Sequence, residues 1–122
     1  MKKIGLCSLD EDFAREYAHK LGLNFVVFTE MVFDFIKENI AKIKNPNHVK
    51  DVFLPTIQHI KNISHDALLL DMEVLMHDEC VAELRNCYTL VNLQNAEPKS
   101  TIEQIMVDDY KARLSQICQE VI

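Results

Sequence analysis

Four short apolar runs, separated by longer segments of helical periodicity, restrict this chain to a small set of folds. Each run is short enough, and rich enough in apolar residues, to be a buried strand rather than a helix. Strands that alternate with helices pair in parallel through right-handed crossovers. The sequence therefore predicts an α/β fold, an open three-layer sandwich with a parallel sheet of about five strands, the fifth being the closing "EVI". The four runs are Lys2–Cys7, Asn24–Phe28, Asp66–Leu75 with a strand that ends near Asp71, and Cys87–Leu93.

Helical patterns fill the intervals between these runs. The first helix is expected to start at Asp10 and to stop at Gly22, and the second to be capped by Thr29 and broken at Asn45–Asn47. Pro55 is expected to kink or divide the third. The later segments are His48–Ile63, His77–Arg85, and Thr101–Gln119, in which a break near Val107–Asp109 is left open.

Length and charge limit the classes of function. At 122 residues the chain is expected to be one domain, residues 1–122, without a separate lid. A net charge of −6 argues against duplex nucleic acid and anionic membrane as partners. No run approaches membrane-spanning length and no signal peptide is recognisable, so we expect a cytoplasmic protein. The four cysteines form no metal-binding pattern, and we expect free, buried thiols and no metal centre.

In open parallel sheets, ligands bind beyond the carboxyl ends of the strands. The candidate site residues are therefore those that follow each predicted strand. They are Ser8–Asp12, Thr29–Glu30, Asp71–Glu73 and Gln94–Glu97.

The segment Ile4–Phe25 has the layout of a phosphate-binding strand–loop–helix, but its loop carries Asp10, Glu11 and Asp12 and no lysine. Two like charges about 4 Å apart repel by roughly 4 kcal/mol at an effective dielectric of 20, more than a helix dipole offsets. We expect Ser8 or Asp10 to accept hydrogen bonds from the first helical turn instead, with Glu11 and Asp12 stabilised by the helix dipole.

The order of segments resembles the small P-loop kinases, most closely the shikimate kinase and dephospho-CoA kinase group. The resemblance lies in "FAREYAHKLGLNFV", "DALLLDMEVL", "CYTLVNLQNAEP" and "YKARLSQICQEVI", and it covers nearly the whole chain. It implies a P-loop-kinase-like sheet, and it implies a magnesium-holding or general-base role for Asp71, with Glu73 beside it.

The phosphate-binding motif of that family, G-x-x-x-x-G-K-[ST], is missing. Its lysine falls at Asp10, its hydroxyl at Glu11 and its second glycine at Leu9, and the family's acid-x-acid pair falls at Val27 and Thr29. No arginine that could serve a lid lies between residues 86 and 112. We therefore expect a non-catalytic interaction or regulatory protein that uses no cofactor.

Two alternatives stay open. The first is a phosphotransfer enzyme or nucleotide binder that uses Asp71 and Glu73 with ATP and magnesium at an atypical loop. The second is an atypical receiver domain, in which the acids Asp10–Asp12 and Asp71 would form the acidic pocket and the phospho-acceptor.

The region from Met31 to Ile63 carries an apolar stripe that a short domain without a lid could leave uncovered. Exposed apolar area of this kind usually contacts a partner. We expect a protein partner or a homodimer to bind here. The candidate surface residues are Met31, Phe35, Phe53 and Ile57.

Overall fold

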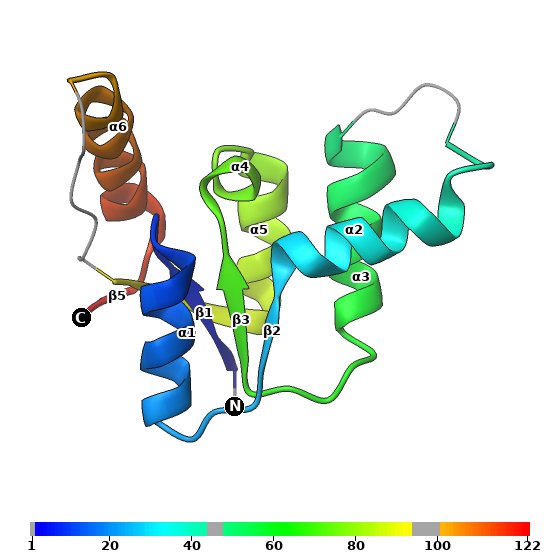
Figure 1. Cartoon of the computed structure of the whole chain (residues 1–122), viewed down its shortest axis with the longest axis horizontal. Helices are drawn as coiled ribbons and strands as arrows, with labels where there is room; N and C mark the ends of the chain where they lie inside the picture. The colour runs from blue at the N-terminus through cyan, green and yellow to red at the C-terminus, as the bar shows by residue number, and fades with distance from the viewer. Residues whose placement is uncertain (1, 44–47, 94–100) are drawn as a thin grey trace.

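The computed structural model describes residues 2–43, 48–93 and 101–122. Five strands form one sheet in the order β2-β3-β1-β4-β5, and all four neighbouring pairs are parallel (Figure 1). The predicted α/β class and the five-stranded parallel sheet are therefore confirmed. The strands are β1 (Lys3–Cys7), β2 (Phe25–Val27), β3 (Ala67–Leu70), β4 (Tyr88–Asn92) and β5 (Glu120–Val121).

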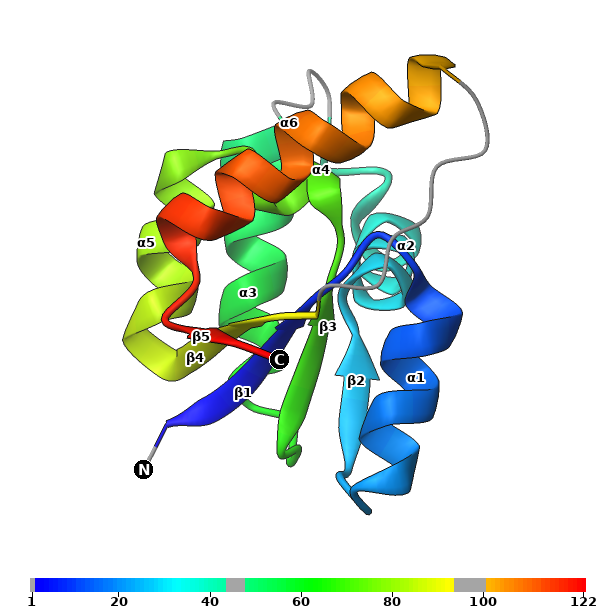
Figure 2. The same ribbon diagram turned by 90° about the vertical axis from the view of Figure 1, so that its left-hand side faces the viewer.

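Helices lie on both faces of the sheet, which gives three layers (Figure 2). Helix α1 covers one face, while α3, α5 and α6 cover the other. Helix α2 extends from the carboxyl end of β2 and packs against α3 (Figure 1). The helices are α1 (Glu11–Lys20), α2 (Phe28–Asn39), the π-helix η1 (His48–Phe53), α3 (Leu54–Ile60), α4 (Met72–Leu75), α5 (Asp78–Cys87) and α6 (Thr101–Ile117).

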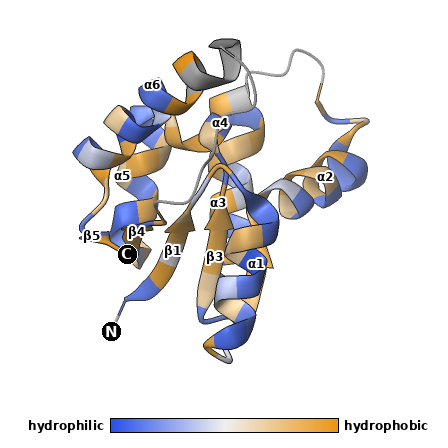
Figure 3. Ribbon diagram, turned by 60° about the vertical axis from the view of Figure 1, so that its left-hand side comes forward, coloured by the Kyte–Doolittle hydropathy of each residue, from blue (hydrophilic) through white to orange (hydrophobic). Residues whose placement is uncertain are grey.

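The core is divided by the sheet because successive strand residues point to opposite faces. Leu6 and Leu69 pack under α1 against Ala14 and Ala18, whose small side chains let the helix lie close to the strands. The larger cluster on the other face joins the sheet to η1, α3, α4, α5 and α6. Strands β1 and β3 are accordingly hydrophobic along most of their length (Figure 3).

Gly5 in the middle of β1 lies against two leucines of the larger cluster. A Cβ atom at this position would lie 2.8 Å from Leu90 Cδ2 and 3.1 Å from Leu70 Cδ1. Both leucines are buried. Gly5 is therefore a packing requirement of the sheet.

The junction between β2 and α2 differs from the sequence prediction. The strand ends at Val27 and the helix begins at Phe28, with Val27 in the capping position and no side-chain cap. The prediction that Thr29 caps this helix is wrong. No loop separates β2 from α2. The ring of Phe28 is buried and packs edge-on against Phe53, with 5.9 Å between the ring centroids.

The segment predicted over His48–Ile63 is divided, as Pro55 suggested. A π-helix runs to Phe53, and α3 follows it directly from Leu54 with Pro55 in its first turn, so the helix type changes just before the proline. Helix α6 is continuous through residues 107–109, and the short helix α4 was not predicted. Within the described ranges, no helix has both the length and the apolar character needed to cross a bilayer.

Candidate functional site

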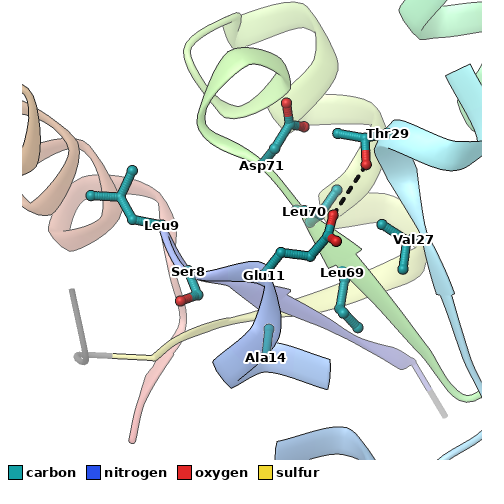
Figure 4. A pocket seen from close by; sticks show the side chains of 9 residues that line it. All are labelled: Ser8, Leu9, Glu11, Ala14, Val27, Thr29, Leu69, Leu70 and Asp71. Carbon is teal, nitrogen blue, oxygen red and sulfur yellow. Dashed lines mark hydrogen bonds between the residues drawn. The ribbon is translucent and has the colours of Figure 1, made fainter. Parts of the chain in front are cut away.

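Three of the predicted site segments meet at the carboxyl end of the sheet. Ser8 follows β1, Thr29 lies in the first turn of α2, and Asp71 follows β3. Together with Glu11 they help to line a cavity of about 40 Å³ (Figure 4). The strand order places β3 between β1 and β2, and this arrangement brings Asp71 beside the start of α1.

The start of α1 is closed by its own side chains. Asp10 is the N-cap, and its Oδ1 accepts a hydrogen bond of 3.1 Å from the backbone N–H of Phe13. The N–H of Asp10 in turn donates to Ser8 Oγ at 3.1 Å. The predicted cap by Asp10 is confirmed. Two of the N–H donors at this helix start, those of Asp10 and Phe13, are therefore already taken by side chains of this loop.

Asp71 is the only carboxylate besides Glu11 among the residues lining the cavity. Its Oδ1 is buried and has no hydrogen-bond partner within the described part of the chain. Burial raises the pKa of this carboxyl, the neighbouring charge of Glu73 adds to the rise, and the backbone N–H groups at the start of α4 partly offset it. Glu73 itself is exposed and does not line the cavity. Asp71 and Glu73, which the resemblance pairs, are therefore not brought together there.

Outside the cavity, α1 and α2 are joined by a small polar network. Arg15 Nε lies 3.2 Å from Glu11 Oε2, and its Nη2 pairs with Glu30 Oε1 on α2. The Thr29 hydroxyl donates to Glu11 Oε1 at 3.3 Å across the mouth of the cavity (Figure 4). Glu11 is thus held by Arg15 and Thr29 at the entrance. No signal along the sequence links Arg15 to Glu30, because the contact depends on how α2 leaves the sheet.

An open hollow of about 490 Å³ adjoins this network on the α2 side. Phe33 provides its apolar wall. Three of its six lining residues are acidic and one is basic, so it offers little to hold an anion. The lining residues are Glu11, Thr29, Glu30, Phe33, Asp34 and Lys37.

All three arginines of the chain are used in structural contacts. Arg15 joins α1 to α2. Arg85 on α5 donates from Nε to the Ile117 carbonyl at 3.0 Å, at the end of α6. Arg113 on α6 donates from Nε to the Leu75 carbonyl at 2.9 Å and from Nη2 to Asp78 Oδ1 at 2.6 Å. No arginine lines the cavity.

Among the described residues, the cavity between Ser8, Glu11 and Asp71 offers few groups for chemistry. A cavity of about 40 Å³ accommodates water, whereas a site for a drug-sized ligand measures roughly 300 to 1,000 Å³. The polar residues that line it in the described part of the chain are acidic or hydroxylic, and none of them is a lysine or an arginine. Among the residues that the structure describes, no three His, Cys, Asp or Glu side chains are grouped to hold a metal ion. The predicted candidates Gln94–Glu97 lie outside the described residues.

The predicted interaction surface is partly wrong. Phe53 and Ile57 are 4% and 1% exposed and belong to the core, because α3 and η1 pack beneath α2. Met31 and Phe35 are half-buried. The large apolar side chains that α2 leaves in solvent are Phe33 and Ile40, each 70% exposed. Their spacing of seven residues places them on one face of the helix, which is the signal that could have identified them.

The four cysteines are free thiols, but the prediction that they are buried is confirmed for only two of them. Cys7 and Cys80 are buried, and Cys87 and Cys118 are half-buried. When the sequence is compared with known proteins, no family model matches it and no curated protein is found as a relative.

Proposed function

We propose that this chain is a non-catalytic interaction or regulatory protein with a P-loop-kinase-like fold, in which side chains of the protein close the former phosphate site. The observation that supports this most is the hydrogen bond from the Phe13 N–H to Asp10 Oδ1. It places a carboxylate at the helix start, where a phosphate-binding protein would hold its ligand.

Two further features support the same proposal. The cavity beside the helix start has room for water only, and two carboxylates, those of Glu11 and Asp71, line it. The arginines that could neutralise a phosphate are engaged in contacts between helices. A phosphate group in this cavity would therefore meet two carboxylates, with no arginine among the lining residues to neutralise it.

The contact with a protein partner would involve the outer face of α2. Phe33 and Ile40 lie two turns apart on this face, with Lys37 between them. A pair of large apolar side chains in solvent is a suitable centre for a protein contact. This partner surface replaces the one predicted from Phe53 and Ile57.

A thermal-shift titration with ADP and ATP in the presence of magnesium tests the proposal. Ligand at a hundredfold excess over its dissociation constant stabilises a protein by about 2.7 kcal/mol, which is easily detected. We expect no saturable shift for the wild-type chain. A saturable shift that disappears in Asp71→Asn, but persists in the exposed-site control Glu73→Gln, would refute a closed site.

One observation favours the second candidate, a nucleotide binder or phosphotransfer enzyme. The buried Asp71 Oδ1 has no partner among the described residues, and a magnesium ion would satisfy it. A saturable shift with ADP or ATP that disappears in Asp71→Asn would identify this function. The receiver domain has less support, because receivers have the strand order 2-1-3-4-5 whereas this sheet runs β2-β3-β1-β4-β5. Stabilisation by beryllofluoride, without any response to nucleotide, would favour the receiver domain.

A further inference from the structure

We propose that the outer face of α2 binds a second copy of this chain, so that two α2 helices pack antiparallel across a two-fold axis. The outer face is defined by the exposed residues Phe33, Asp34, Lys37 and Ile40. This inference rests on the proposed function, because it names the partner of the interaction surface described there.

Helix α2 has one covered side and one uncovered side. Its inner side packs against the core through the half-buried residues Met31, Val32 and Ile36, and the helix contacts η1 and α3. From the end of the edge strand β2, the helix extends outward beyond the sheet (Figure 1). A second molecule can therefore reach the outer face without meeting the sheet.

Phe33 and Ile40 give this face its apolar centre. Each is 70% exposed, and in the described part of the chain no other large apolar side chain is as exposed. Their spacing of seven residues places them on one side of the helix, about 10 Å apart along its axis. Apolar residues at this repeat are the ones that line the seam between two packed helices.

A two-fold axis makes the outer face complementary to itself. When the axis crosses α2 midway between Phe33 and Ile40, Phe33 of each copy lies level with Ile40 of the other copy. Both apolar side chains then leave the solvent in the same contact. Because every contact in such an interface occurs twice, the dimer contains two of these apolar pairs.

Asp34 and Lys37 supply the charge complementarity that selects a second copy in this orientation. Both are exposed, and neither forms an ion pair with another described residue. In the antiparallel arrangement, Asp34 of one copy and Lys37 of the other differ in level by about 3 Å along the helix, since each residue rises about 1.5 Å. The two aspartates and two lysines alternate in sign around the axis. A parallel arrangement would instead place each charge beside its own kind.

The surroundings of Asp34 leave access for the lysine of a second copy. Asp34 and Lys37 help to line the open hollow of about 490 Å³ beside Phe33. Glu30, one turn before Asp34, is already paired with Arg15 of α1 and so adds little repulsion between the copies. A lysine at a single position of a helix seam fixes the register of the two helices at some cost in stability.

The size of the outer face sets the expected strength of the dimer. Helix α2 has 12 residues, so one of its faces is much smaller than a standard interface of about 1,600 Å². Interfaces of this size belong to weak, reversible contacts. We therefore expect a dimer whose population depends on protein concentration.

Sedimentation velocity of the full chain, between about 10 µM and 1 mM, measures this equilibrium. We expect the wild type to shift from monomer to dimer across the series, and the double variant Phe33→Ser and Ile40→Ser to stay monomeric throughout. The matched control is the double variant Leu21→Ser and Ile105→Ser, which removes two side chains that are 56% and 59% exposed elsewhere. It should dimerise like the wild type. Circular dichroism checks that each variant is folded.

Charge reversal tests the orientation. Asp34→Lys and Lys37→Glu each place like charges across the axis twice, and we expect each to weaken the dimer about tenfold. An equal mixture of the two variants should restore it, because both lysines of one chain then face both acids of the other. Asp109→Lys and Lys111→Glu on α6 make the same changes in net charge, and they should leave the dimer unchanged.

Three results would overturn the inference. The first is a wild type that stays monomeric up to about 1 mM. The second is a dimer that survives Phe33→Ser with Ile40→Ser, since it would form through another surface. The third is a mixture of the two charge-reversed variants that dimerises no better than either alone. A monomeric wild type that also gives no thermal shift with nucleotide would refute only the second copy as the partner, whereas a saturable nucleotide shift would refute the proposed function itself.

Discussion

At the scale of single residues, Asp10 determines how the start of α1 is satisfied. Its side chain accepts from Phe13 N–H, and its own N–H is bound by Ser8. This local arrangement could be predicted, because a capping side chain and the N–H that donates to it lie within three positions of each other in the sequence. What the sequence could not supply is the neighbour of this loop, Asp71, which the sheet order brings in from a distant segment.

Removal of this cap should destabilise the protein. We expect Asp10→Ala to lower the free energy of unfolding by about 1 kcal/mol, because one helix N–H loses its acceptor. The control Asp12→Ala lies in the same turn and interacts with the helix dipole, and it should cost about 0.5 kcal/mol or less. Urea denaturation measures both values. Equal losses would show that the cap makes no specific contribution.

Asp71 should make stability depend on pH. Because burial raises its pKa above the ordinary value of 3.8, the folded chain binds this proton more tightly than the unfolded chain. Its contribution to stability is fully present below pH 3.8 and is lost as the pH rises through the raised pKa. We therefore expect Asp71→Asn to raise the free energy of unfolding at neutral pH, with the gain vanishing at low pH.

Chemical denaturation across a pH series measures this difference. The control is Asp109→Asn, which removes an exposed charge on α6. If Asp71→Asn instead lowers stability at neutral pH, the ionised carboxylate has a stabilising partner, such as a bound cation, and the closed-site account fails.

Gly5 should not tolerate a side chain. In Gly5→Ala, the new Cβ would lie 2.8 Å from Leu90 Cδ2, and the buried leucines on both sides leave little room for adjustment. Overpacking of this kind costs about 1 to 3 kcal/mol. Thermal or urea unfolding of Gly5→Ala measures the loss. A variant as stable as the wild type would show that Leu90 can move aside.

At the scale of elements, the strands were predicted well and the junctions were not. Apolar runs such as "ALLL" in β3 identify a buried strand by composition alone. The start of α2 at Phe28 could not be found this way, because it depends on the contact between Phe28 and Phe53. The interaction surface failed for the same reason: whether Phe53 and Ile57 are covered depends on packing between helices.

Helix α2 offers a direct contrast between its two faces. We expect Phe28→Ala to lower the free energy of unfolding by about 3 to 5 kcal/mol, because the ring fills the core. The double variant Phe33→Ser and Ile40→Ser should stay within about 0.5 kcal/mol of the wild type, since both side chains lie in solvent. Urea denaturation compares the two, and a large loss in the double variant would mean that this face is packed.

At the scale of the whole molecule, the crossover connections between strands determine which residues meet at the candidate site. They insert β3 between β1 and β2, so that Glu11 and Asp71 line the same cavity. The chain has a net charge of −6, and all three arginines are engaged in contacts between elements, so none of the arginines is free to bind a phosphate. The capped start of α1 and the acidic, water-sized cavity beside it together make up the proposed closed phosphate site.

The most direct test is a titration of the ¹⁵N-labelled chain with ATP and magnesium, followed in amide ¹H–¹⁵N correlation spectra. The amides from Ser8 to Phe13 report on the helix start itself. We predict that their shifts do not change as the nucleotide is added. Saturable shifts concentrated in these amides would show phosphate at the start of α1, and would contradict the closed site.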